Sequence, residues 1–192
     1  MKIYLIRHGE TKEGAQGIIL GSIGGNLNDT GLTYSREVAR FFKANKIHLA
    51  KIICSNLSRA IQTSEIISKE LHVPLLIEEL VRERFAGVAE GKREQDIDWV
   101  IYESVPLAVR KHQGGESFQE VKSRAEKFIK SLTVAKQQNI LIVSHSVFIL
   151  MFLSIIKGIS IEDALKIKTS DTLFVVDLAQ KRVETISLAH SQ

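Results

Sequence analysis

A histidine that follows an arginine at the end of an apolar segment is the feature of this chain best suited to chemistry. The run Ile3-Tyr4-Leu5-Ile6 stops at Arg7-His8-Gly9, which predicts an interior parallel strand that ends in polar residues. Open α/β sheets bind ligands just beyond the carboxyl ends of their strands. His8 can offer a neutral nitrogen as nucleophile, Arg7 can grip phosphate oxygens, and Gly9 leaves room for close approach. Unless this segment is only a surface turn, it predicts a site that attacks phosphorus.

Two later segments carry basic residues at similar places. Arg59 follows the apolar run that ends at Cys54, one turn into an expected helix, where its charge can reach back over the strand ends. His145 follows a third apolar run and opens another helix, where free backbone N–H groups favour an anion. Taken singly, Arg59 could be a helix-surface arginine and His145 a polar residue at a helix start. A fourth candidate is Glu83, although most glutamates in such a mixed-charge stretch are solvated.

The order of apolar and polar runs predicts how these residues are positioned. Strands that alternate with helices imply a three-layer α/β sandwich: a mainly parallel sheet of about six strands, helices on both faces and one antiparallel edge. The expected strands are Lys2–Ile6, Lys51–Cys54, Leu75–Ile77, Ile140–Ser144, Thr172–Asp177 and Val183–Ile186. The expected helices are Thr30–Ala44, with Thr30 or Asp29 as N-cap, Leu57–Leu71, a helix from the Ser117–Glu120 capping box to Leu132, and Ser144–Lys157.

The length, composition and charge of the chain limit the classes of protein to which it can belong. The 192 residues, 44% of them hydrophobic, fit a single domain over 1–192, with a lid-like excursion at about 80–115 that is partly helical near 96–102. A net charge of +4 without a dense basic block suits a small phosphorylated metabolite better than nucleic acid. One cysteine and no export signal favour the cytoplasm, and no run approaches the ~20 residues that span a membrane. The oligomeric state stays open.

The motifs together resemble the histidine phosphatase superfamily, the phosphoglycerate-mutase-like enzymes, over nearly the whole chain. The segments that carry the resemblance are Arg7-His8-Gly9-Glu10-Thr11, Ser55-x-Leu57-x-Arg59-Ala60-x-x-Thr63, Glu83-x-Phe85-x-Gly87 with Glu90-Gly91, Gly115-Glu116-Ser117 and Ser144-His145. The resemblance implies a phosphate pocket of Arg7, Arg59 and His145 around the nucleophile His8, with Glu83 as proton donor. No metal or cofactor is expected, because these cationic groups take the role of a phosphate-neutralising ion and the sequence shows no carboxylate cluster for Mg²⁺. Glu79, Glu90 and Glu116 are the nearby alternatives for the donor.

These roles are chemically consistent. His8 must stay neutral despite its cationic neighbours, and a carbonyl that accepts its other N–H would fix the tautomer. His145 would add a third cation if it were protonated.

The loop at 12–28 departs from the family pattern. Gly14 stands where many members carry an asparagine, so nearby Gln16 is expected to compensate in phosphate binding, together with Thr11 and Ser146. The pair Tyr34-Ser35 replaces a common glutamine-alanine pair in the first long helix. These changes leave His8, Arg7, Arg59 and His145 intact.

Other interpretations compete with hydrolysis through histidine. Cys54 and Arg59 resemble a cysteine-phosphatase loop, but that loop needs five intervening residues and here there are four, so Cys54 is expected to be buried. His48, His72, His112 and His190 lack metal-ligand spacing. A mutase that returns the phosphoryl group to a second hydroxyl, and a non-catalytic phospho-ligand binder, are the alternatives; the compact chain favours hydrolysis, and the retained His8 and Glu83 disfavour a binder.

Overall fold

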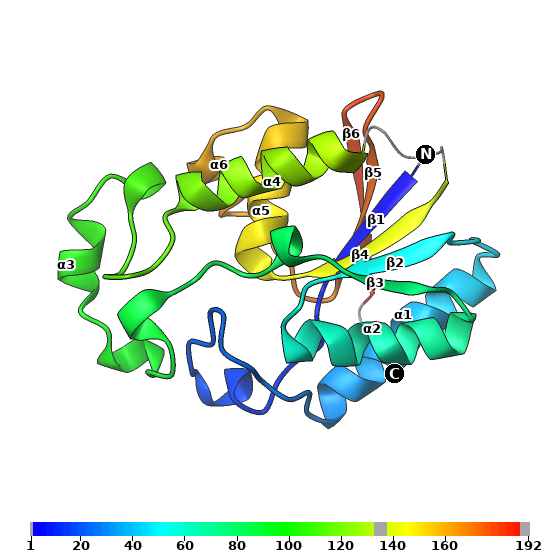
Figure 1. Ribbon diagram of the computed structural model, residues 1–192, viewed down its shortest axis with the longest axis horizontal. Coiled ribbons are helices and arrows are strands. Elements are labelled where there is room, and N and C mark those ends of the chain that lie inside the picture. Colours follow the sequence, from blue (N-terminus) through cyan, green and yellow to red (C-terminus); the bar gives the residue numbers. More distant parts are fainter. Residues whose placement is uncertain (1, 133–137, 189–192) are drawn as a thin grey trace.

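A six-stranded sheet forms the centre of the molecule (Figure 1). The computed structural model describes residues 2–132 and 138–188. The strands are β1 (Lys2–Arg7), β2 (Lys51–Cys54), β3 (Leu75–Ile77), β4 (Ile140–Ser144), β5 (Thr172–Asp177) and β6 (Arg182–Ser187). They lie in the order β3-β2-β4-β1-β5-β6; the first four run parallel, and β5 is antiparallel to both β1 and β6. The predicted mainly parallel sheet with an antiparallel edge is therefore confirmed.

Helices cover both faces of this sheet. The helices are α1 (Asp29–Ala44), α2 (Ser58–Leu71), α3 (Trp99–Glu103), α4 (Phe118–Leu132), α5 (Ser146–Lys157) and the short α6 (Ile161–Ala164). In Figure 1, α1 and α2 lie below the sheet, and α4, α5 and α6 lie above it. Strand residues alternate between the two apolar cores: Ile3 and Leu5 pack with α4 and α5, whereas Tyr4 and Ile6 pack with α1 and α2. This period of two is what a strand covered on both faces requires.

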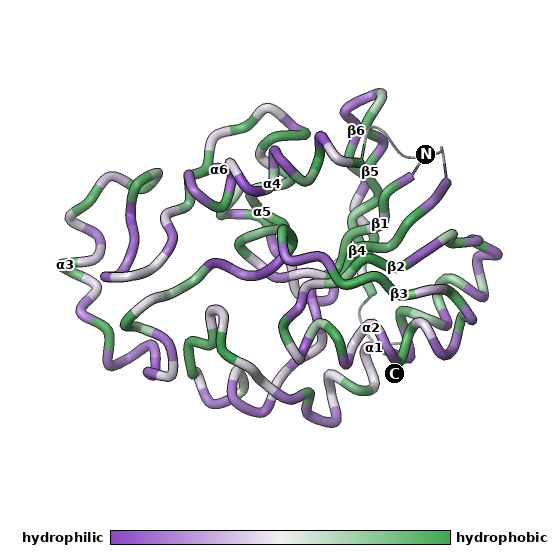
Figure 2. The backbone as a smooth tube through the Cα atoms, viewed as in Figure 1, coloured by the Kyte–Doolittle hydropathy of each residue, from purple (hydrophilic) through white to green (hydrophobic). Residues whose placement is uncertain are grey.

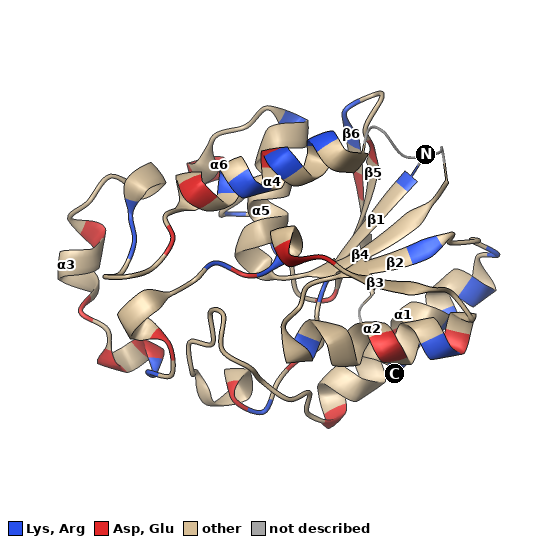
Figure 3. Cartoon of the chain, in the orientation of Figure 1, with Lys and Arg blue, Asp and Glu red and all other residues tan. Residues whose placement is uncertain are grey.

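The helix α5 is the most apolar element beside the sheet. Its residues Phe148–Leu153 are all buried, because α4 and α6 cover the side that faces away from the sheet. Figure 2 shows hydrophobic residues concentrated along the inner strands and α5, and Figure 3 shows charged residues mainly on the other helices and loops. Among the described residues, no helix is long and apolar enough to cross a bilayer.

Three helix starts differ from the sequence prediction, and for α2 the difference is one residue, because Leu57 is the N-cap and the helix begins at Ser58. The helix α1 is capped by Asn28, not by Thr30 or Asp29: the Asn28 side chain accepts from the Gly31 N–H at 2.9 Å, and its own N–H donates to the Glu10 carbonyl at 3.1 Å. This long-range contact with the loop after β1 selects the cap. The apolar helix starts at Ser146, because Ser144 ends β4 and His145 is extended. The Ser117–Glu120 capping box is confirmed, with reciprocal hydrogen bonds of 2.6 and 3.2 Å.

The segment 80–115 leaves the sheet and extends beside the carboxyl ends of the strands (left in Figure 1). It consists of single 3-10 turns and α3, which matches the partly helical excursion expected near 96–102. The ring of Tyr102 stacks on His112 with centroids 4.3 Å apart, and its hydroxyl accepts from Arg84 at 2.8 Å. An isolated antiparallel bridge between Ile18 and Arg93 joins the segment to the loop before α1.

We expect replacement of Gly31 by alanine to destabilise the protein, although alanine normally favours a helix. A Cβ at residue 31 would overlap the main-chain oxygen of Glu10, so α1 would have to move away from the loop that follows β1. Overpacking of this kind typically costs about 1–3 kcal/mol, and urea unfolding would measure it as a lower midpoint. Thr33→Ala, at an exposed position of the same helix, is the control. Greater stability of Gly31→Ala would contradict this packing.

Candidate active site

His8 lies where β1 ends, and its hydrogen bonds define its tautomer. The backbone N–H of His8 donates to the Ser144 carbonyl at 2.9 Å, so the residue is fixed against β4. The imidazole Nδ1 lies 2.7 Å from the Gly9 carbonyl oxygen. A carbonyl can only accept, so Nδ1 carries the proton and Nε2 keeps its lone pair. Arg59 Nε donates to this Nε2 at 3.1 Å.

The surroundings of His8 keep its ring neutral. Burial lowers the pKa of His8 well below its usual value, and the charges of Arg59 and Arg7 lower it further, against the bond to the Gly9 carbonyl. His8 is only 9% exposed. The neutral imidazole that the sequence analysis required is therefore the form present at neutral pH.

Arg59 is buried, not placed on the helix surface. Its terminal nitrogens donate to the carbonyls of Ile23 at 2.8 Å and Gly21 at 2.6 Å. Its own carbonyl accepts from Thr63 Oγ1 at 2.8 Å, and the same hydroxyl accepts from the Gly9 N–H at 3.0 Å. Arg59 thus links α2, the loop before α1 and the nucleophile candidate, and each terminal nitrogen keeps one N–H for a ligand.

His145 lies beside His8 at the carboxyl end of β4. The two ring centroids are 5.0 Å apart and the rings are tilted by 57°. Both ring nitrogens of His145 are buried and have no hydrogen-bond partner among the described residues. Buried polar groups are rarely left unsatisfied in proteins. Burial, followed by His8, Arg59 and Arg7, lowers the pKa of His145 well below its usual value. Without an anion, His145 therefore offers a hydrogen bond and not a third charge.

Glu83 reaches the same place from the start of the 80–115 segment. One carboxylate oxygen accepts from the Arg84 N–H at 2.8 Å, and the other accepts from the Val147 N–H, in the first turn of α5, at 3.4 Å. The neighbouring arginines point elsewhere: Arg82 pairs with Glu116, and Arg84 bonds Tyr102. Glu83 is therefore held by backbone groups over the ends of the parallel strands.

The other glutamates proposed as donors have different positions. Glu79 is exposed, and Glu90 accepts from Ser22 and from the Ala86 N–H. Glu116 binds Arg82 at 2.7 Å and the buried Arg124 at 3.0 Å. Burial raises the pKa of Glu116, but hydrogen bonds from Arg82 and Arg124 outweigh it and hold the value at about 2. Glu116 is thus ionised at neutral pH, so it has no proton to donate.

Arg124 connects this ion pair to Glu83. Its guanidinium donates to the carbonyls of Leu80 at 2.9 Å, Arg82 at 2.7 Å and Glu83 at 3.3 Å. The Gly115-Glu116-Ser117 motif therefore neutralises a buried arginine that fixes the backbone under Glu83.

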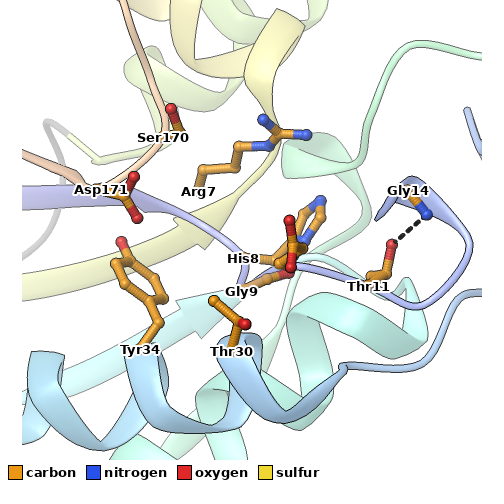
Figure 4. Close-up of a pocket in the computed structure, with 10 residues that line it drawn as sticks. Arg7, His8, Gly9, Thr11, Gly14, Thr30, Tyr34, Ser170 and Asp171 are labelled. Carbon is orange, nitrogen blue, oxygen red and sulfur yellow. Dashed lines mark hydrogen bonds between the residues drawn. The ribbon is translucent and has the colours of Figure 1, made fainter. Parts of the chain in front are cut away.

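Two cavities meet at His8. The first, of about 270 Å³, is called the Glu83 cavity; its lining includes Arg7, His8, Thr11, Arg59, Glu83 and Glu94. The second, of about 340 Å³, is called the Tyr34 cavity (Figure 4); it shares Arg7, His8 and Thr11, and adds Thr30, Tyr34, Ser170 and Asp171. Glu83 and His8 therefore border one common space, and only on the Glu83 side.

The structure separates the remaining predicted phosphate ligands. Thr11 is buried and lines both cavities, where its hydroxyl accepts from the Gly14 N–H at 3.0 Å. Gln16 is exposed and lies outside the set of residues that line these cavities. Ser146 bonds Thr169 through its hydroxyl at 2.9 Å and also lies outside that set. The structure thus brings Thr11 to His8, but not Gln16 or the Ser146 hydroxyl.

Several residues that line the cavities were not proposed from the sequence, and Tyr34 and Glu94 are two of them. Figure 4 shows the Tyr34 hydroxyl directed toward Asp171, and this hydroxyl is buried with no hydrogen-bond partner in the described part of the chain. Its only signal in the sequence was the departure from the common glutamine-alanine pair. Glu94 belongs to a run of exposed polar residues, 92–96, four of them charged, and nothing in that run distinguishes it.

Cys54 and the other histidines do not form a competing site. Cys54 is buried, and this burial raises the pKa of its thiol to about 11, so it is not a thiolate. Within residues 2–132 and 138–188, no group of three or more His, Cys, Asp or Glu residues could hold a metal ion. His190 lies outside the described residues.

The fold and the arrangement around His8 are those of an α/β phosphatase. More particularly, the chain belongs to the histidine phosphatase superfamily (branch 1), whose family model matches residues 3–187. The predicted family resemblance is therefore confirmed.

Several relatives are named as phosphatases. The chain is 35% identical over 135 residues to fructose-2,6-bisphosphatase TIGAR B of Danio rerio, a match covering 67% of this chain but 51% of that protein. It is 28% identical to the adenosylcobalamin/alpha-ribazole phosphatase of Escherichia coli, over 76% of this chain and 73% of that one. The alpha-ribazole phosphatase of Shigella flexneri superposes with a TM-score of 0.85 at 25% identity, over 99% and 96% of the two chains.

The ion pair of Glu116 makes the stability of the protein depend on acid pH. The pKa of Glu116 is about 2 in the folded protein against a reference of 4.5, so its stabilisation is complete above pH 4.5 and is lost as pH falls toward 2. We expect the free energy of unfolding of the wild type to exceed that of Glu116→Gln most above pH 5. The difference in unfolding free energy between the wild type and Glu116→Gln should narrow by on the order of 3 kcal/mol on acidification. Urea unfolding at several pH values would measure it. If this difference in unfolding free energy did not change with pH, the ion pair of Glu116 would not be the cause of the acid sensitivity.

Proposed function

We propose that the protein hydrolyses phosphomonoesters of small metabolites through a phosphohistidine formed at His8 Nε2. The observation that carries this proposal is the fixed tautomer of His8. The Gly9 carbonyl holds the proton on Nδ1, which leaves the lone pair of Nε2 next to Arg59 Nε at 3.1 Å. The imidazole is buried and neutral, and its Nε2 lone pair accepts a hydrogen bond from Arg59 Nε. When a bound phosphoryl group takes over that N–H, the lone pair becomes free to attack phosphorus.

Phosphate binding uses the groups around Nε2. Arg7 and the remaining N–H groups of Arg59 supply positive charge in planar geometry, which matches phosphate oxygens better than lysine would. His145, whose ring nitrogens accept or donate no hydrogen bond within residues 2–132 and 138–188, donates one to the same oxygens. A bound dianion would also favour protonation of His145, because a negative charge raises the pKa of a neighbouring imidazole. These groups meet the charge of the transferring phosphoryl group without a metal ion.

The reaction then has two steps. In the first, Nε2 forms a bond to phosphorus, the bond from phosphorus to the ester oxygen breaks, and protonated Glu83 gives its proton to the departing oxygen. In the second, the Glu83 carboxylate takes a proton from water, the water oxygen attacks phosphorus, and the N–P bond breaks to release phosphate and restore His8. Glu83 supports both roles because it borders the same cavity as His8 and Arg59.

We expect His8 to be phosphorylated during turnover. Rapid quenching with labelled substrate should trap a phosphoenzyme that is stable to alkali and labile to acid, because a phosphorus–nitrogen bond breaks on protonation. His8→Ala should lack the label and lose hydrolysis. His48→Ala is the control, since His48 lies away from both cavities. A fully active His8→Ala would contradict the proposal. If the wild type binds phosphate but is never labelled, the protein is a non-catalytic binder of phosphorylated ligands.

Glu83→Gln should slow hydrolysis of alkyl phosphates about 10²–10⁴-fold, the range for a positioned proton donor. The first step with p-nitrophenyl phosphate should slow much less, because p-nitrophenolate leaves without a proton. A burst of p-nitrophenol followed by slow turnover would reveal accumulated phosphoenzyme. Glu79→Gln is the control at an exposed neighbouring carboxylate. If Glu83→Gln keeps parental rates on alkyl phosphates while Glu116→Gln does not, the donor is Glu116.

A further inference from the structure

One carboxylate of the Glu83 cavity has no part in the proposed reaction. Glu94 lines this cavity together with His8, Arg59 and Glu83. The proton donor must stand beside the departing oxygen, so the leaving group of the substrate lies in this cavity and not in the Tyr34 cavity. Glu94 therefore adds a negative charge to the wall that the leaving group meets.

The backbone around Glu94 is fixed to the opposite loop. Its N–H donates to the Gly17 carbonyl at 3.0 Å, and next to it the Ile19 N–H donates to the Lys92 carbonyl at 2.9 Å. The Glu94 carbonyl accepts from the indole N–H of Trp99 at 3.0 Å. The place of Glu94 on the wall is therefore set by main-chain pairing between the two loops that frame the cavity.

The cations that line the cavity are already engaged. Arg7 and Arg59 serve the transferring phosphoryl group. Arg84 bonds the Tyr102 hydroxyl at 2.8 Å and lies over the Phe118 ring, 4.4 Å from its centroid. Lys92 and Arg93 are exposed and lie outside the set of lining residues. A second acidic group on the substrate would therefore meet the Glu94 carboxylate. Of the cations that line the cavity, only Arg84 is left to pair with that group, and its guanidinium is oriented by Tyr102 and Phe118.

The rest of the wall of the Glu83 cavity is apolar. Ile18, Ile19 and Leu20 line it from the loop before α1, and Ala86 and Val147 line it from the other side. Such a surface binds uncharged parts of a ligand by excluding water, whereas an anion placed there would lose hydration without compensation.

From this charge distribution we propose that Glu94 is a specificity-determining residue, a role that rests on the proposed function of the same site. It selects phosphomonoesters whose alcohol is uncharged or cationic, and it disfavours substrates that carry a second phosphate or a carboxylate near the ester. Like charges brought together across an interface disfavour the wrong partner in this way.

Matched substrates test this selection. Glycerol 3-phosphate and 3-phosphoglycerate differ only in a hydroxymethyl group against a carboxylate, and phosphoethanolamine and phosphoserine differ only by a carboxylate. The wild type should hydrolyse the member without the carboxylate with a kcat/KM at least about fivefold higher, the effect of one partly screened like charge. A preference for the carboxylate-bearing members would overturn the inference.

Substitution of Glu94 tests whether this residue causes the preference against substrates with an additional carboxylate. Glu94→Gln should raise kcat/KM for 3-phosphoglycerate by about fivefold and leave that for glycerol 3-phosphate within about twofold. Asp96→Asn removes an exposed charge from the same turn, outside the lining of the cavity. It should leave the ratio of kcat/KM between 3-phosphoglycerate and glycerol 3-phosphate unchanged. An unchanged ratio in Glu94→Gln would overturn the role of Glu94. Absence of hydrolysis of every phosphomonoester, p-nitrophenyl phosphate included, would instead overturn the proposed function, and this inference with it.

Discussion

The hydrogen bond from Arg59 to the lone pair of His8 is the contact on which the rest of this site depends. It requires a neutral histidine with its proton on the far nitrogen, and the Gly9 carbonyl provides that tautomer. It also requires a buried arginine, which the carbonyls of Gly21 and Ile23 satisfy. The close approach of Gly9 to Gly31, where a Cβ on Gly9 would lie 2.6 Å from the Gly31 oxygen, keeps the loop after β1 against α1. The contacts that pack the loop after β1 against α1 and the contacts that orient the His8 ring therefore lie at the same residues.

A second set of buried charges supports the other half of the site. Arg124 is 8% exposed and orders the backbone that precedes Glu83, and Glu116 compensates its charge. A buried arginine without this carboxylate would carry a desolvation penalty of several kcal/mol. The sequence separates Glu83 and Glu116 by more than thirty residues, yet the two carboxylates belong to one arrangement: Glu83 borders the cavity of His8, and Glu116 neutralises the arginine that holds the backbone of Glu83.

The sequence predicted the parts of this protein that local patterns determine. Strand runs such as Ile140–Ser144 are apolar because both faces of the sheet are covered, and the ends of β1 and β4 therefore indicated His8 and His145. The Asn28 cap escaped prediction because it depends on a contact with Glu10, far away in the chain. Gln16 was expected near phosphate on proximity in sequence alone, but the turn at Gly14–Gln16 leaves it exposed. Glu94 could not be distinguished from its charged neighbours without the pairing of residues 17–19 with 91–94.

The way Arg59 holds the loop before α1 bears on how such a chain can change over evolution. Both loop partners of the guanidinium are main-chain carbonyls, at Gly21 and Ile23, so the contact does not depend on which side chains the loop carries. Loop positions that line the pocket, such as Ile18 and Ile19, can therefore change while Arg59 keeps its contact with His8. Gly21, with its positive φ, and the α1 cap Asn28 are constrained by the backbone. Because the loop holds Arg59 through its main chain, single side chains of the loop can change the pocket without loss of the pairing between Arg59 and His8.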